Sequence, residues 1–117
     1  MKTENKIQEL SFDLSIQIIN LYKSLVEKKE YILSKQLLKS GTSIGANVEE
    51  AIAAQTRKDF ITKMSIASKE ARETRYWLRL LDKSKLVDID YSAYLNSIEQ
   101  IINILTKIVK TSQESMV

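Results

Sequence analysis

Several residue types that commonly carry chemistry are missing from this sequence. It has no cysteine, no histidine and no proline, and it has only two glycines. Without cysteine there is neither a disulfide nor a thiolate metal site. The lack of histidine also removes the commonest general base and most transition-metal sites, so we expect neither an enzyme nor a cofactor. The lack of proline leaves few obligatory breaks in the chain, which favours long helices.

Long apolar runs are absent as well. No segment approaches the ~18–20 apolar residues that a bilayer crossing needs. The first residues lead into an amphipathic stretch and do not resemble a cleavable signal peptide. Together with the lack of cysteine, these features predict a cytoplasmic protein that does not associate with membranes. The length of 117 residues is that of one domain, residues 1–117.

Apolar residues recur every three or four positions, which is typical of helices with one buried face. The spacing predicts helices at about residues 4–27, 32–55, 57–83 and 90–111. The third has a regular heptad seam, formed by Phe60, Met64, Ala67, Ala71, Thr74, Leu78 and Leu81. Because short connections force neighbouring helices to run antiparallel, we expect an all-α, up-down-up-down four-helix bundle.

Polar residues beside the apolar stretches predict where the helices begin and end. Ser34 and Thr56 are candidate N-caps for the second and third helices, and Asp59 completes a capping-box-like start after Thr56. Either Asp88 or Asp90 is expected to cap the fourth helix. The polar chain from residue 110 onward is expected to fray.

Both glycines lie in the stretch 40–51, which starts like a loop and ends like a helix. A glycine is a common helix stop, but the apolar phase continues across this stretch without a reset. We therefore expect one continuous helix, in which Gly41 and Gly45 let another backbone approach closely. Asn47 lies among apolar neighbours and is expected to bridge a backbone group near the glycines or to specify register.

The net charge is +3, and the basic excess is concentrated in one segment. Residues 57–85 include nine basic and four acidic side chains, a net charge of +5. Cations fall on one side of the third helix, away from its apolar seam, at Lys58, Lys69, Arg72, Arg75, Arg79 and Lys83. This basic row could track a phosphate backbone, and Tyr76 within it could stack on a base or cover the arginine stems. The alternative is a solvated helix face, partly neutralised by Glu70 and Glu73.

Two further patterns allow more than one interpretation. Four glutamates, Glu49, Glu50, Glu70 and Glu73, could form a carboxylate metal cluster, but ion pairs with nearby Arg57, Lys69, Arg72 and Arg75 are the simpler account. We therefore expect no bound metal. The third helix also has a second apolar face, which needs either another helix or another subunit as its partner. The candidates for helix packing or an oligomer interface are Gly41, Gly45, Asn47, Ile66, Trp77 and Leu80.

The first helix has a second apolar stripe too. Phe12, Ile16, Ile19 and Val26 lie beside its main apolar face. Because the combined apolar surface is wide, this helix is expected to touch more than one neighbour.

A specific block of sequence resembles a known family. The block consists of Gln36-Leu37, Ser40-Gly41-Thr42-Ser43-Ile44-Gly45-Ala46-Asn47-Val48-Glu49-Glu50-Ala51, Asp59-Phe60, Lys63, Ala67, Lys69-Glu70-Ala71, Glu73-Thr74 and Tyr76-Trp77-Leu78. It closely resembles the bacterial four-helix-bundle family named for open reading frames in intervening sequences of 23S ribosomal RNA. That family is similar in turn to the accessory variability determinant of diversity-generating retroelements, a basic homopentamer that binds nucleic acid and a reverse transcriptase.

The resemblance implies a homopentamer of four-helix bundles that binds nucleic acid. This chain has a milder net charge than the retroelement protein, and a reverse-transcriptase partner is not carried over to it. Our first hypothesis is therefore a non-enzymatic oligomer that binds RNA or DNA through the basic row. The second is a structural or adaptor protein that binds a protein partner and has no nucleic-acid role. The third is a carboxylate metal enzyme.

Overall fold

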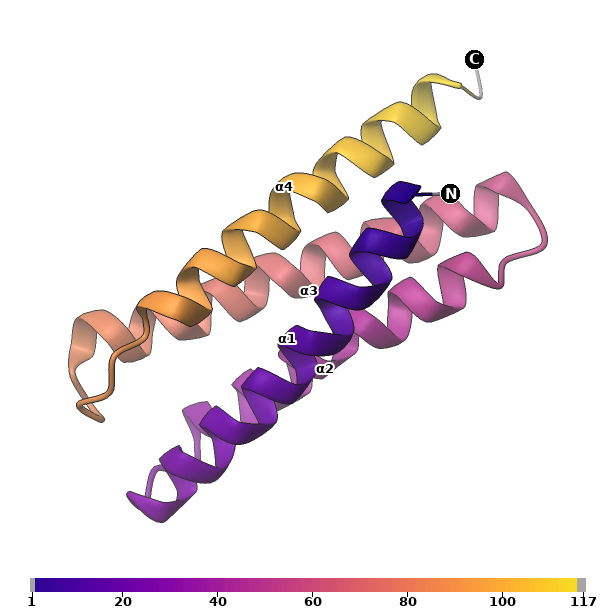
Figure 1. Ribbon diagram of the computed structural model, residues 1–117. Helices are drawn as coiled ribbons and strands as arrows, with labels where there is room; N and C mark the ends of the chain where they lie inside the picture. The colour runs from indigo at the N-terminus through magenta and orange to yellow at the C-terminus, as the bar shows by residue number, and fades with distance from the viewer. Residues whose placement is uncertain (1, 116–117) are drawn as a thin grey trace.

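Four helices form all of the regular structure in the described part of the chain, residues 2–115. The computed structural model describes residues 2–115, in which there are helices α1 (Lys2–Glu27), α2 (Leu33–Ile52), α3 (Arg57–Ser84) and α4 (Ser92–Glu114), and no strand. The predicted all-α class is confirmed. The helices lie along one long direction, with the three connections at the ends of the molecule (Figure 1), and the extents are 48 × 21 × 21 Å. Helix α2 packs against α1 and α3, and α4 packs against α3 and α1.

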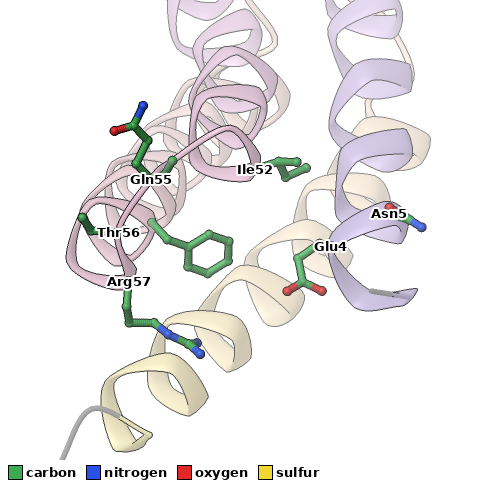
Figure 2. A pocket seen from close by; sticks show the side chains of 8 residues that line it. Glu4, Asn5, Ile52, Gln55, Thr56 and Arg57 are labelled. Carbon is green, nitrogen blue, oxygen red and sulfur yellow. The ribbon is translucent and has the colours of Figure 1, made fainter.

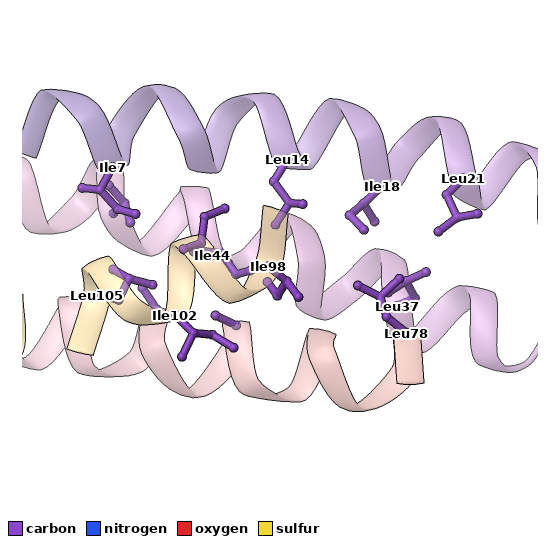
Figure 3. Packing of buried hydrophobic residues seen from close by; sticks show 14 of the residues in the cluster. Ile7, Leu14, Ile18, Leu21, Leu37, Ile44, Leu78, Ile98, Ile102 and Leu105 are labelled. Carbon is purple, nitrogen blue, oxygen red and sulfur yellow. The ribbon is translucent and has the colours of Figure 1, made fainter. Parts of the chain in front are cut away.

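The core lies along the middle of this arrangement. Figure 3 shows Ile7, Leu14, Ile18 and Leu21 of α1 facing buried side chains of the other helices, among them Leu37, Ile44, Leu78, Ile98, Ile102 and Leu105. The heptad seam of α3 is buried as predicted, except that Phe60 at its start is half-buried. The 3–4 spacing of apolar residues therefore identified the faces that exclude water.

Helix α2 continues without a break through both glycines, as predicted. At Gly41, a Cβ atom would lie 2.9 Å from two side-chain carbons of Ile18. At Gly45, it would lie 3.3 Å from the carbonyl oxygen of Ser11. The small residues of α2 thus let α1 pack closely against it, which compensates for the ~1 kcal/mol of helix propensity that each glycine loses.

The helix starts agree only partly with the predicted caps. The Thr56 hydroxyl accepts a hydrogen bond from the Asp59 N–H at 3.1 Å, so the Thr56 cap is confirmed. The Ser34 cap is wrong, because Ser34 lies inside α2. The carboxylate of Glu30 instead accepts hydrogen bonds from the N–H groups of Ile32, Leu33 and Ser34.

Two helix ends also differ from the predicted ones. Helix α2 ends at Ile52 and not at about residue 55. The N–H of Ala54 bonds to the carbonyl oxygen of Ala51 in a tighter turn, and the chain is extended at Thr56 (φ −127°, ψ 155°), which caps α3. Helix α4 continues to Glu114, beyond the predicted end at about residue 111. Ser112 is buried in this last part of the helix, which holds it against the rest of the molecule.

Helix α1 contacts both α2 and α4, yet part of its apolar surface remains uncovered. Within the second stripe, Phe12 is 61% exposed, Ile16 47% and Ile19 40%. We call these three side chains the α1 stripe. No helix in the described part of the chain is long and apolar enough to cross a membrane.

Candidate nucleic-acid interface

The basic row lies on α3, and most of its side chains reach solvent. Lys58, Lys69, Arg72, Arg79 and Lys83 are exposed, and Arg75 is half-buried. The buried seam of the same helix occupies different positions, so the cations and the core do not compete for one face. The row is therefore available as a surface along α3.

Two arginines of the row lean toward α4. The Nη1 of Arg75 lies 2.6 Å from Oε1 of Glu99, in an ion pair whose side chains are 29% and 51% exposed. Such a solvated pair is worth at most about 1 kcal/mol. Arg72 donates a hydrogen bond from Nη2 to the hydroxyl of Thr106 at 3.1 Å. The middle of the row thus spreads from α3 onto the seam between α3 and α4.

The other cations of the row form no ion pair with a carboxylate in the described part of the chain. Within residues 2–115, no ion pair involves Lys58, Lys69, Arg79 or Lys83. These charges are spread along one helix and are not neutralised by ion pairs. An anion from outside the chain would therefore meet several unpaired cations.

Glu70 and Glu73 of α3 form no ion pair with the arginines that they were expected to neutralise. Glu73 accepts a hydrogen bond from the indole Nε1 of Trp77 at 3.1 Å. Glu70 is half-buried, and this burial, followed by the nearby charge of Glu73, raises its pKa, while Lys39 and Lys69 act to lower it. The predicted pairing of these glutamates with Arg72 and Arg75 does not occur.

The four glutamates proposed as a metal cluster do not gather at one site. Both carboxylate oxygens of Glu49 accept hydrogen bonds from Gln8, at 2.9 and 3.0 Å. Glu50 pairs with Lys63 at 2.9 Å, across the connection between α2 and α3. Among the described residues, no three acidic side chains lie close enough together to hold a metal ion.

The residues predicted to serve in packing or in an oligomer interface are wholly or partly buried by other residues of the same chain. Trp77 packs on the hydrophobic core and meets the ring of Tyr76 edge-on, with centroids 5.1 Å apart. Ile66 and Leu80 are half-buried. Gly41 and Gly45 are buried against α1, as described above. Asn47 donates from Nδ2 to the carbonyl oxygen of Ser43 at 2.8 Å, so it bridges a backbone group of its own helix.

A groove between α3 and α4 was not anticipated from the sequence. It has a volume of about 270 Å³ and is lined by Ser65, Ser68, Arg72, Thr106, Val109, Lys110 and Gln113. Only Arg72 belonged to the predicted site. The signal in the sequence was the spacing of polar residues by three or four positions, which places them on one face of each helix. These residues are Ser65, Ser68 and Arg72 on α3 and Thr106, Lys110 and Gln113 on α4.

A second hollow lies at the end of the molecule where α2 connects to α3. Figure 2 shows Glu4 and Asn5 of α1 on one side and Ile52, Gln55, Thr56 and Arg57 on the other, and the volume is about 420 Å³. Charges of both signs and the apolar side chains of Ile52, Ala54 and Phe60 line this hollow. It therefore has no chemistry that selects one class of ligand.

These features define the general class of the protein, which is a small all-α protein of four packed helices with a cationic surface on the third. The family described as 23S rRNA-intervening sequence protein matches residues 3–107, and this chain belongs to that family. A solved structure from Bacteroides thetaiotaomicron, described as a protein of unknown function from the S23 ribosomal protein family, is similar. It is 46% identical, with a TM-score of 0.88, over 92% of this chain and 98% of that one. No curated protein matches the chain.

Proposed function

We propose that this protein is a non-enzymatic, oligomeric helical-bundle protein that binds the backbone of RNA or DNA through the basic row. The observation that carries the proposal is the set of exposed cations on α3 that have no carboxylate partner among the described residues. From Lys69 to Lys83 the helix rises by about 21 Å, a length over which a nucleic-acid strand presents several phosphates. The family's description, which refers to 23S ribosomal RNA, agrees with this class of ligand.

Assembly is the second part of the proposal. We infer that the chain forms an antiparallel, up-down-up-down four-helix bundle, which is the unit of a homopentamer in the cytoplasm. The α1 stripe supports an oligomer, because three large apolar side chains in a row are rarely left in water. A pentamer would repeat the basic row five times and, with +3 on each chain, would carry a net charge of +15. Repetition raises affinity for a long polyanion through multivalency.

The binding proposal is tested by measuring affinity for RNA and for duplex DNA as a function of salt. We expect affinity to fall steeply between about 50 and 200 mM salt, since counterions are released when cations meet phosphates. The variant Lys69→Gln/Arg79→Gln/Lys83→Gln should weaken binding by at least tenfold and reduce the salt slope by about 2 for a single strand.

The matched control changes three exposed lysines on α1 and α2. Lys6→Gln/Lys23→Gln/Lys35→Gln alters the net charge by the same amount but lies outside the row. It should bind within about threefold of the wild type, since distant charges act only through the screened overall field. Equal losses in both variants would show that net charge matters and the row does not. Absence of binding at about 50 mM salt would end the proposal.

The α1 stripe also favours the alternative, an adaptor that binds a protein partner and no nucleic acid. Apolar side chains exposed in a row are the usual anchors of a protein interface. This function would be supported by a defined partner that binds the wild type, is lost with Ile16→Ser, and is retained by the Lys69, Arg79 and Lys83 variant. Salt-dependent nucleic-acid binding would argue against it.

A further inference from the structure

The groove between α3 and α4 differs in charge from four other hollows of the described surface. Arg72 and Lys110 line it, and none of its lining residues is acidic. Four other hollows each include at least one carboxylate, from Glu4, Glu9, Asp13, Glu49, Glu50 or Asp59. A ligand of this groove therefore meets positive charge without a competing acid.

The groove also contains hydroxyls that are not used inside the protein. Ser65 and Ser68 are half-buried, and no hydrogen bond within residues 2–115 involves their side chains. Other hydroxyls of α3 bond back to the preceding turn, as Thr62 does to the Lys58 carbonyl and Thr74 to the Glu70 carbonyl. No buried side-chain polar atom in this part of the chain lacks a partner, so the two serine hydroxyls are accessible to a ligand.

Thr106 completes the set of donors from the side of α4. Its hydroxyl oxygen already accepts the hydrogen bond from Arg72, so its own proton remains able to point into the groove. The same contact holds the guanidinium of Arg72 across the seam between the helices. The groove thus combines a positioned arginine, a lysine and three hydroxyl donors.

A tetrahedral oxyanion matches this combination. Phosphate oxygens accept hydrogen bonds from hydroxyls and from guanidinium, and they form stronger, charge-assisted bonds with cations. The volume of about 270 Å³ is below the ~300–1,000 Å³ of typical small-molecule sites, so it suits one phosphodiester with its waters better than a whole nucleotide.

We propose that this groove seats one phosphodiester of the bound nucleic acid, held by Arg72 and Lys110 with the hydroxyls of Ser65, Ser68 and Thr106. The inference rests on the nucleic-acid-binding function proposed above, and it alters the path of the strand. The backbone would follow α3 from Lys83 past Arg79 to Arg72 and would then enter the seam with α4. It would not continue straight along α3 to Lys58.

The test compares two lysines of α4 that lie three residues apart. Lys110 lines the groove, whereas Lys107 lines a different hollow together with Glu4 and Arg57. Both are exposed, so neither substitution should disturb the fold, which circular dichroism can verify. With a single-stranded RNA of roughly 20 nucleotides, Lys110→Gln should weaken binding about tenfold and reduce the salt slope by about 0.7, while Lys107→Gln should bind within about twofold of the wild type.

The hydroxyls give an independent signature. Ser65→Ala/Ser68→Ala removes donors but no charge, so affinity should fall by about threefold or more at an unchanged salt slope. If Lys110→Gln binds like Lys107→Gln, the groove is not a phosphate site, and the nucleic-acid proposal survives as long as the Lys69, Arg79 and Lys83 variant loses affinity. If the wild type binds neither RNA nor DNA, both proposals fail.

Discussion

Glu30 shows how one side chain can take over the role of a helix cap. It is 8% exposed, and its carboxylate accepts three backbone N–H hydrogen bonds from the first turn of α2. Burial alone would raise the pKa of Glu30, but the N–H groups of Ser34, Leu33 and Ile32, with the Ser34 hydroxyl, outweigh it and lower the pKa below 4.5. The charged form is therefore favoured in the folded state.

This sign predicts how stability depends on pH. Because the folded-state pKa of Glu30 lies below the unfolded one, its contribution is complete above pH ~4.5 and is lost as the pH falls through the folded-state value. At about pH 7, Glu30→Gln should lower the free energy of unfolding by about 1–2 kcal/mol. In urea titrations at about pH 3, the difference between variant and wild type should shrink. A difference that stays constant with pH would contradict the assigned role.

The contact between Gly41 and Ile18 leads to a prediction at the same scale. Alanine would improve helix propensity by ~1 kcal/mol, but its Cβ would lie 2.9 Å from Cγ1 and Cγ2 of Ile18. Both carbons are attached directly to the Ile18 Cβ, so the side chain cannot swing away easily. Gly41→Ala should therefore destabilise the protein by about 1–3 kcal/mol in chemical denaturation.

A double-mutant cycle isolates this contact. In an Ile18→Ala background the clashing carbons are absent, so Gly41→Ala should become neutral or stabilising. If the cost of Gly41→Ala is the same in both backgrounds, the close approach of α1 at this point is not its cause.

At the scale of the element, the sequence predicted the features that depend on residue spacing within one helix. It missed the features that depend on contacts with neighbouring segments. The period of the apolar residues located the four helices, and the start of α3 was predicted from Thr56 followed by Asp59. Ser34 failed as a cap because Lys29 adopts a positive φ of 66°, which directs the chain so that Glu30 returns to the first turn. A left-handed lysine is not visible in the sequence.

The candidate site divides in the same way. Helical spacing predicts that the basic row shares one side of α3, because that property belongs to a single helix. The groove depends on how far α4 is shifted along α3, which places Thr106 beside Arg72 and Glu99 beside Arg75. Nothing in the polar spacing of either helix fixes that register, so Lys110, Ser65 and Ser68 were not predicted.

The cap of α3 can be tested against a matched threonine of the same helix. Thr56→Ala removes the acceptor for the Asp59 N–H and should cost about 1 kcal/mol of stability. Thr62 is exposed and only bonds back to the Lys58 carbonyl of its own helix, so Thr62→Ala should change stability by less than about 0.5 kcal/mol. Urea denaturation of the two variants decides the point. Similar effects would mean that Thr56 contributes no specific cap.

At the scale of the whole molecule, the α1 stripe requires an explanation that the single chain does not supply. Phe12, Ile16 and Ile19 lie on a helix that already packs against two neighbours, so a further chain is the natural cover. The acidic groups beside the stripe, Glu9 and Asp13, lie on a different helix from the basic row. An interface built on α1 would therefore leave the cations of α3 free for nucleic acid.

This separation predicts that assembly can be broken without unfolding the chain. Native mass spectrometry at micromolar concentration should show a multimer for the wild type and a monomer for Ile16→Asp. Burying the aspartate charge in an apolar interface removes it from water, and this desolvation costs on the order of several kcal/mol. Leu86→Asp is the control: Leu86 is 58% exposed but lies in the connection between α3 and α4, so the multimer should persist. A monomeric wild type, or an Ile16→Asp multimer, would contradict an interface on α1.

Because avidity requires several basic rows, the Ile16→Asp monomer should also bind a long RNA at least tenfold more weakly, while its affinity for a short strand that contacts one chain should be unchanged.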